Sequence, residues 1–229
     1  MLQGFFYPFL WAFLQSKKGA LYEQAFTIVQ QLLVDAGYTG KVVVISDWER
    51  GIITAINSCL QNASVEGCAI HHTMIINKRI AKLGQIESAE LKLWLNRMKS
   101  LFFLPHDLLR PSQMVKNPLV DGMKHFDEIK QFLAYYKSEW ITKWPMVTKH
   151  MKTIRTTNSC ENYWSGMKKQ LEAPLHPSAC LVEYMWSEEY DTYLRLSQLT
   201  THTVPKKRLK AVQLQELISN KMESFERLS

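Results

Sequence analysis

The sequence has few cysteines and no pattern that would link them into a disulfide framework. Its 229 residues include four cysteines, which are widely spaced and form no CxxC pair: Cys59, Cys68, Cys160 and Cys180. Small secreted domains usually depend on dense, paired cysteines. The scarcity therefore argues against that class of protein and favours a reducing compartment.

A recognisable signal peptide and a membrane-spanning run are also lacking. The first fourteen residues are apolar, but no Lys or Arg precedes them, and Ser16-Lys17-Lys18 follows where a cleavage site would need small residues. The run is too short to cross a bilayer. Its bulky aromatic side chains predict a buried strand instead, with the core of a signal peptide as the alternative.

Acidic residues are in the minority, 21 against 28 Lys and Arg, which gives a formal net charge of +7. No internal repeat or low-complexity tract occurs, and the 46% of hydrophobic residues is ordinary for a globular protein. A basic balance indicates nucleic acid as a partner, although a merely basic surface explains the charge equally well.

Strands and helices are expected to alternate through the first seventy residues. After the opening strand, residues 21–33 place apolar side chains on one helical face, and residues 41–45 form a β-branched run typical of a strand buried on both faces. A helix over residues 48–60 and a strand over 64–70 follow. This βαβαβ order predicts an α/β fold with a largely parallel sheet.

From His72 onward the periodicity is helical, and prolines separate the segments. The expected helices cover residues 86–104, 122–144, 157–171, 177–199 and 206–228. An α/β front half followed by an all-helical back half predicts a small sheet that carries a large helical insertion.

Asp47 directly follows the strand expected over residues 41–45. Catalytic groups collect at the carboxyl ends of parallel strands, and a carboxylate there suits a hard divalent cation. A structural role is the alternative. Ser46 and Glu49 have the spacing of a capping box, so Ser46 or Asp47 could simply cap the next helix.

Cys68 and His71 form a CxxH pair at the end of the next expected strand. The pair could supply two ligands of a zinc site, but a structural site needs two more. No second ligand pair lies nearby, and four residues could contribute only through tertiary contact: His72, Cys160, His176 and Cys180. A buried cysteine beside a hydrogen-bonded histidine is the simpler interpretation.

Glu161 lies in the first turn of the helix expected over residues 157–171. Asn158 and Glu161 have capping-box spacing, so Glu161 could do no more than satisfy the helix N-terminus. A carboxylate in that position can also face a metal ion, and the two roles are compatible.

Short basic groups give five candidate phosphate contacts: Lys78, Arg79, Lys82, Lys168 and Lys169. Runs of this length are usually solvated helix faces, and phosphate contact is the minority outcome for any one of them. A further basic cluster between Lys206 and Lys210 is interpreted as a solvated helix start.

In their order along the chain, these motifs resemble the catalytic domain of Mutator-like (MULE) DDE transposases. Seven segments carry the resemblance: residues 5–33, 42–49, 67–71, 79–84, 101–105, 155–164 and 176–178. The resemblance implies a partial RNase H-like core over residues 1–71, a helical insertion over 72–154, a glutamate-bearing helix with closing helices over 155–200, and a C-terminal polar helix over 201–229.

The resemblance also implies a chemistry, namely metal-dependent DNA cleavage and strand transfer with Mg²⁺ or Mn²⁺. By motif, Asp47 is the second catalytic carboxylate and Glu161 the third, and Cys68 and His71 are the family's CxxH pair. We therefore expect Asp47 and Glu161 to approach closely in space. The implied partner is the double-stranded DNA of transposon ends, the implied location is the nucleus, and the chain could act as a homo-oligomer.

The chain departs from the family pattern in its first segment. Residues 1–34 contain no aspartate, so the strand that bears the family's first catalytic aspartate is expected to be missing. The chain is therefore interpreted as an N-terminally truncated, inactive transposase fragment. The alternatives are a domesticated, non-catalytic DNA-binding or regulatory protein, and an unrelated helical protein whose motifs are only helix caps.

Overall fold

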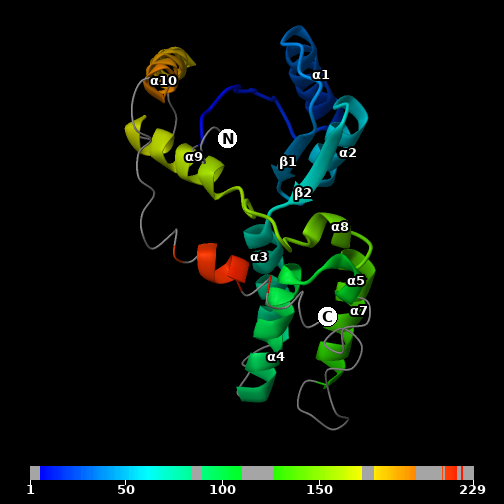
Figure 1. The fold of residues 1–229 in the computed structure, drawn as a ribbon. Helices are drawn as coiled ribbons and strands as arrows, with labels where there is room; N and C mark the ends of the chain where they lie inside the picture. Colours follow the sequence, from blue (N-terminus) through cyan, green and yellow to red (C-terminus); the bar gives the residue numbers. More distant parts are fainter. Residues whose placement is uncertain are drawn as a thin grey trace. The chain divides into compact units, whose positions relative to one another are not determined.

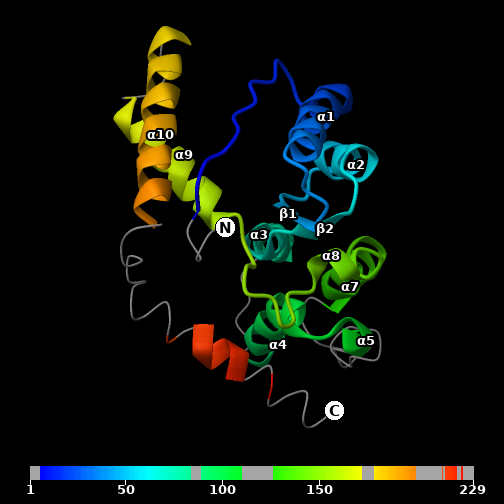
Figure 2. The ribbon, with the colours of Figure 1, turned by 45° about the horizontal axis from the view of Figure 1, so that its top comes forward.

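The structure, a computed structural model, describes residues 6–83, 89–109, 126–171 and 178–199, together with 213, 215–220 and 223. The chain divides into two compact units, which are described separately (Figures 1 and 2). The sheet-bearing unit comprises residues 16–156 and 216–229, and the second unit comprises residues 1–15 and 157–215.

A parallel βαβ arrangement forms one end of the sheet-bearing unit. Strand β1 (Val42–Ser46) leads through helix α2 (Arg50–Cys59) to strand β2 (Ala63–Gly67), and the two strands pair in parallel. Helix α1 (Gly19–Asp35) precedes them and packs against α2 (Figure 1).

Helix α1 stops in a way that sets the start of β1. Gly37 has a φ of +64°, a backbone conformation that glycine adopts without strain. Its N–H donates to the carbonyl of Val34, and the N–H of Tyr38 donates to that of Leu33, each over 2.9 Å. These two bonds form a Schellman motif, so the chain leaves the helix at a fixed angle and enters the sheet.

Helices pack into a cluster that follows β2 directly. They are α3 (Ala69–Ile80), η1 (Ala81–Leu83), α4 (Ala89–Ser100), η2 (Leu101–Phe103), α5 (His106–Leu109), α7 (Phe126–Trp140) and α8 (Trp144–Val147). Their shared core includes the fully or almost fully buried Ile76, Met98, Ile129, Tyr136 and Trp144. Burial of each large apolar side chain contributes about 1.5–3 kcal/mol, so this cluster is a main source of stability for the unit.

A buried ion pair joins the helical cluster to the sheet. The Nζ atom of Lys149 is fully buried and donates to Glu66 of β2 over 3.0 Å, and Lys152 reaches the other oxygen of Glu66 over 2.9 Å. Burial alone would raise the pKa of Glu66, but the hydrogen bonds and charges of Lys152 and Lys149 outweigh it and lower the pKa. The segment after α8 is therefore held against β2.

Two long helices make up most of the described part of the second unit, α9 (Asn158–Gln170) and α10 (Ser178–Leu199). Residues 6–14 run extended beside α9, where the indole N–H of Trp11 donates to the hydroxyl of Tyr163 over 3.1 Å. The Phe6 ring lies 6.0 Å from the ring of the same tyrosine. Among the described residues, no helix is both long and apolar enough to span a bilayer.

The expected α/β order is confirmed in part. Helix α1, both strands of the βαβ unit and the helical back half form where the sequence predicts them, although α2 begins at Arg50 rather than at Trp48. The prediction of a strand in the first fourteen residues is wrong for residues 6–14, which use their aromatic side chains on α9 and join no sheet.

The prediction of a larger, fully covered sheet is not met. The described residues contain a two-stranded sheet, and Val43 in β1 is 51% exposed rather than buried on both faces. The fold is thus a mostly helical α/β arrangement. In the expected C-terminal helix, residues 215–220 are helical. His176 and the cluster from Lys206 to Lys210 lie outside the described residues.

Candidate metal-binding site at the strand ends

The parallel register brings Asp47 and Cys68 to the same edge of the sheet. The last paired residues are Ser46 and Gly67, so Asp47 and Cys68 are the first residues beyond the two strands. The N–H of Cys68 donates to the carbonyl of Ser46 over 2.8 Å, which extends the pairing by one more step. Residues far apart in sequence thus become neighbours through sheet geometry alone.

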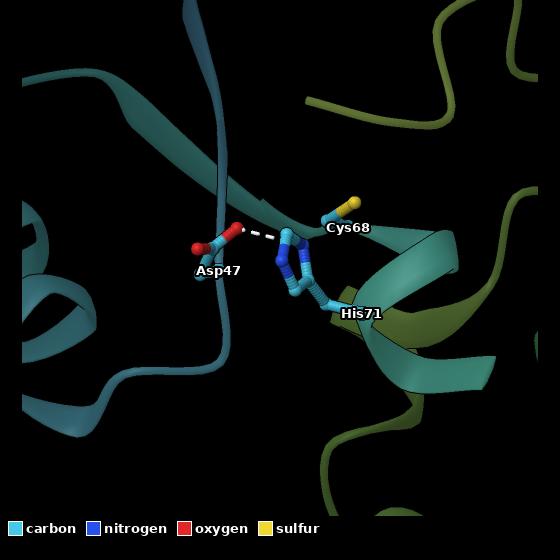
Figure 3. Close-up of side chains that lie close together, drawn as sticks. All are labelled: Asp47, Cys68 and His71. Carbon is cyan, nitrogen blue, oxygen red and sulfur yellow. Dashed lines mark ion pairs between the residues drawn. The ribbon is translucent and has the colours of Figure 1, made fainter. Parts of the chain in front are cut away.

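His71 completes the group from the first turn of α3. Its Nδ1 atom lies 2.9 Å from the Oδ1 atom of Asp47. Figure 3 shows the imidazole reaching from the helix toward the carboxylate, with Cys68 at the junction of β2 and α3. One donor atom from each of the three residues lies within 4.8 Å of the other two. The side chains of Asp47 and His71 are 50% and 29% exposed, whereas Cys68 is fully buried.

Trp48 anchors this edge from inside. Its indole N–H donates to the carbonyl of Cys68 over 3.0 Å, and its ring meets that of Trp140 edge-on at 4.9 Å. The ring occupies the space where a side chain at Gly67 would lie. Any larger residue at position 67 would therefore have to displace Trp48 and, with it, the strand ends.

Glu49 is engaged in its own contacts. The hydroxyl of Tyr22 donates to Glu49 over 2.7 Å, and Lys17 reaches it over 3.3 Å. The hydrogen bond from Tyr22 is the largest influence on Glu49 and lowers its pKa. Burial, and to a smaller extent the hydrogen bond to Glu49, raise the pKa of Tyr22 to about 12. Helix α2 has Glu49 at its N-cap without a side-chain capping bond, and Ser46 donates to the carbonyl of Asp47. Neither Ser46 nor Asp47 is the N-cap residue of α2.

Glu161 lies on α9 in the second unit, and its approach to Asp47 stays a prediction. Its carboxylate accepts a hydrogen bond from the Thr157 hydroxyl over 3.0 Å, and its N–H donates to the Thr157 carbonyl. The N-cap of α9 is Thr157 rather than Asn158, and Thr157 makes no side-chain capping bond.

The basic candidates fall into two exposed groups. Lys78 and Arg79 occupy the last turn of α3, and Lys82 follows in η1. The Arg79 guanidinium lies 4.1 Å from the centre of the Tyr135 ring. Lys78 is two helical turns beyond His71, so both residues share a helix face. Lys168 and Lys169 occupy the last turn of α9 in the second unit.

Of the further zinc ligands considered from sequence, His72 is the one whose side chain is described in the sheet-bearing unit. Cys160 belongs to α9 in the second unit, and the side chains of His176 and Cys180 lie outside the described ones. His72 is buried in the helical cluster. The third donor in the described residues is Asp47, which no sequence pattern connects to the CxxH pair.

His72 points into a cluster of aromatic rings. Trp140 lies 4.5 Å from it, with Tyr136, Trp48 and Phe102 within 6.4 Å. The side chain is fully buried, and neither ring nitrogen has a hydrogen-bond partner among the described residues. Burial lowers the pKa of His72 to about 4, so the imidazole is neutral at physiological pH.

Comparison with known families identifies the chain. The family described as "Transposase, Mutator family" matches residues 20–176, well over half of the sequence, and the chain belongs to that family. The matched range contains Asp47, Cys68, His71 and Glu161. Comparisons with curated proteins and with solved structures gave no match.

Proposed function

We propose that this chain derives from a Mutator-family transposase, whose chemistry is DNA cleavage and strand transfer, and that Asp47 and Glu161 are the ligands it supplies to a Mg²⁺ or Mn²⁺ site. The observation that carries the proposal is the position of Asp47, half exposed at the carboxyl edge of two parallel strands, inside the range that matches the family. Open α/β sheets bind ligands at that edge.

The chemistry of the donor atoms around Asp47 decides which of them can bind Mg²⁺. Mg²⁺ prefers oxygen ligands, so Asp47 fits the ion, whereas the thiol of Cys68 and the imidazole of His71 do not. Glu161 is the other oxygen ligand in the proposal. When bound, the ion would activate a water molecule or a 3′-hydroxyl and stabilise the leaving oxygen.

The chain's own residues have a positioning role in this proposal. The hydrogen bond from Trp48 and the strand pairing hold Asp47 at a fixed point, while its half-exposed carboxylate stays open to a phosphodiester. His71 lies against that carboxylate and orients it. Fixing a ligand in this way reduces the reorganisation that the reacting groups require.

Binding of double-stranded DNA at transposon ends is part of the proposal. Lys78 shares a helix face with His71, and Lys82 follows in the next short helix, so a duplex phosphate backbone at the strand ends would meet positive charge. Lys168 and Lys169 would contribute from α9. The proposal places the chain in the nucleus, and pairing of two transposon ends would require more than one copy.

Mn²⁺ binding followed by electron paramagnetic resonance tests the metal assignment. The free-ion signal should decrease as Mn²⁺ binds the full chain, and Asp47→Asn and Glu161→Gln should each weaken binding at least about tenfold. Asp127→Asn removes an exposed carboxylate from the first turn of α7 and should bind Mn²⁺ like the parent. Unchanged Mn²⁺ affinity in Asp47→Asn would remove Asp47 from the site, and the same result in Glu161→Gln would remove Glu161.

A further inference from the structure

We propose that Asp47, Cys68 and His71 form a zinc-binding site that shares Asp47 with the proposed carboxylate site and takes a water molecule as its fourth ligand. Three protein ligands and an open position are the usual composition of a zinc site that exchanges its fourth ligand. The observation behind the proposal is that oxygen, sulfur and nitrogen donors from two strand ends and one helix turn converge within 4.8 Å.

The separations are close to those that zinc needs. Zinc–ligand bonds of roughly 2.0–2.3 Å in a tetrahedron place the donor atoms about 3.3–3.8 Å apart. The Asp47 and His71 donors lie 2.9 Å apart, and no pair of donors in the group exceeds 4.8 Å. Changes of about 1 Å, within reach of side-chain rotation, would therefore bring all three to bonding distance.

The charges of the three ligands match the ion. Zinc binds Cys as the thiolate, so its arrival transfers the thiol proton of Cys68 to solvent. A thiolate, a carboxylate and a neutral imidazole then carry two negative charges, which Zn²⁺ cancels. Cys68 is fully buried and stands at the N-cap of α3, where the helix dipole favours a negative group. A neutral complex avoids the cost of a buried net charge.

The protein frame holds the ligands before any metal arrives. The Cys68 N–H is bonded to Ser46, the Cys68 carbonyl accepts from Trp48, and the N–H of Ala69 donates to the carbonyl of Arg155 over 3.0 Å. Asp47 and His71 remain partly exposed, which gives the ion a route in. Sites held this way lose little entropy when they close on the metal.

A shared ligand gives the site a regulatory consequence, which rests on the proposed function. Asp47 cannot complete a zinc complex with Cys68 and His71 and also serve a magnesium or manganese ion in the same geometry. Zinc should therefore displace Mn²⁺ from the chain and act as an inhibitor of its metal-dependent chemistry.

Cobalt substitution tests the site directly, because Co²⁺ bound to a thiolate gives a near-ultraviolet charge-transfer band and visible bands typical of four-coordination. The full chain, reduced and stripped of metal, should bind one Co²⁺ with both sets of bands, and Zn²⁺ should remove them stoichiometrically. Cys68→Ser should abolish the charge-transfer band. Absence of that band in the parent, or its survival in Cys68→Ser, would overturn the proposal.

Two further variants test the site independently of Cys68→Ser, in case that substitution at a buried position destabilises the chain. His71→Asn and Asp47→Asn change partly exposed side chains, and each should weaken Co²⁺ binding at least about tenfold. The matched controls Cys160→Ser, His106→Asn and Asp127→Asn alter exposed residues and should leave the spectrum and affinity unchanged. A band lost in Cys160→Ser would assign the thiolate to α9 instead and refute the site.

Glu161 separates this proposal from the preceding one. Glu161→Gln should weaken Mn²⁺ binding and leave Co²⁺ and Zn²⁺ binding intact. If Mn²⁺ binding proves independent of Asp47 and Glu161 while the cobalt spectrum behaves as expected, the carboxylate site fails and the zinc site stands. Loss of the cobalt spectrum in Glu161→Gln would refute a site built from these three ligands.

Discussion

The strand-end edge and helix α9 carry the two proposed carboxylates in very different settings. Around Asp47, strand pairing, the Trp48 anchor and a buried ion pair tie the backbone to a large apolar core. In α9, Met167 is the buried residue, and α10 shows no buried residue in its described side chains. The first setting is built to hold donor atoms still, whereas the second presents most of its side chains to solvent.

This difference has a practical meaning for mutation. Changes beneath the strand ends should alter folding and metal binding together, because the same contacts serve both. Changes on α9 should alter function with little effect on stability.

Removal of Lys149 should be the most damaging change. Lys149→Ala leaves Glu66 buried with only Lys152 to balance it, and loss of one partner of a buried pair costs about 3–5 kcal/mol. Urea denaturation should show a much lower midpoint for this variant. The control is Lys143→Ala, which removes the lysine of an exposed pair with Glu139 and should cost about 1 kcal/mol or less. Equal losses in both variants would contradict the structural role of the buried pair.

His72 should make the stability of the sheet-bearing unit depend on pH. Burial lowers its pKa from 6.5 to about 4, so the unfolded chain takes up a proton that the folded chain excludes. The contribution is fully present above pH 6.5 and is lost as the pH falls toward about 4, by about 3 kcal/mol in total. The charged or titratable side chain that contacts the imidazole is Tyr136, whose pKa burial raises.

Denaturation of the parent and of His72→Leu across that pH range, with a chelator present, measures this effect. The variant should lose less stability than the parent on acidification, and the two curves should differ by the proton linkage of one group. Parallel curves would show that His72 is accessible to solvent or is already protonated in the folded chain.

Two glycine-to-alanine substitutions, one in each unit, should change stability in opposite directions. Gly67→Ala forces a methyl group into the Trp48 ring, and overpacking of this kind costs about 1–3 kcal/mol. It should also weaken Co²⁺ binding, because the ring anchors Cys68. Gly166→Ala lies inside α9 with open space around it and should stabilise that helix by about 0.5–1 kcal/mol. Thermal melts of both variants measure the stability changes, and cobalt titrations measure Co²⁺ binding. Stability changes of the same sign, or unchanged Co²⁺ binding in Gly67→Ala, would contradict the prediction.

The smallest expected effect concerns the salt dependence of DNA binding. The parent should bind duplex DNA weakly and with little sequence preference, and affinity should fall as salt rises. In the double mutant Lys78→Ala, Arg79→Ala, the salt slope should fall by about one unit per lost phosphate contact. The matched control Lys92→Ala, Arg97→Ala removes the same charges from the exposed face of α4 and should keep the parent slope. A parent slope near zero would mean that the charge is ordinary surface charge.

Sequence reasoning succeeded where local pattern decides structure. The β-branched run before Asp47 and the apolar stripes on either side predict β1, α1 and α2 with ends one or two residues from those observed, because these elements follow short-range rules. The same short-range rules gave a wrong prediction of a strand for the opening aromatic run. Its side chains fit a strand, but Trp11 and Phe6 find partners on Tyr163, and a residue so distant in sequence leaves no local signal.

The candidate site could be predicted from the sequence only in part. Asp47 and the CxxH pair were each identified, but their convergence depends on the register in which Ser46 faces Gly67. Two parallel strands that end one residue before Asp47 and Cys68 could have suggested it. The pairing of Glu66 with Lys149 and the aromatic surroundings of His72 depend on tertiary packing across the helical cluster, and no local pattern announces them.

The hydrogen bond from Ala69 to Arg155 shortens the effective distance between the two carboxylate-bearing segments. It closes the whole helical insertion into a loop whose base is one backbone bond at the start of α3. Glu161 follows Arg155 by only six residues. A fully extended chain of that length spans about 20 Å, which is the largest possible distance between the Glu161 backbone and the Arg155 carbonyl. Under the proposed function, Glu161 would therefore be a ligand on a short tether rather than one from a distant part of the chain.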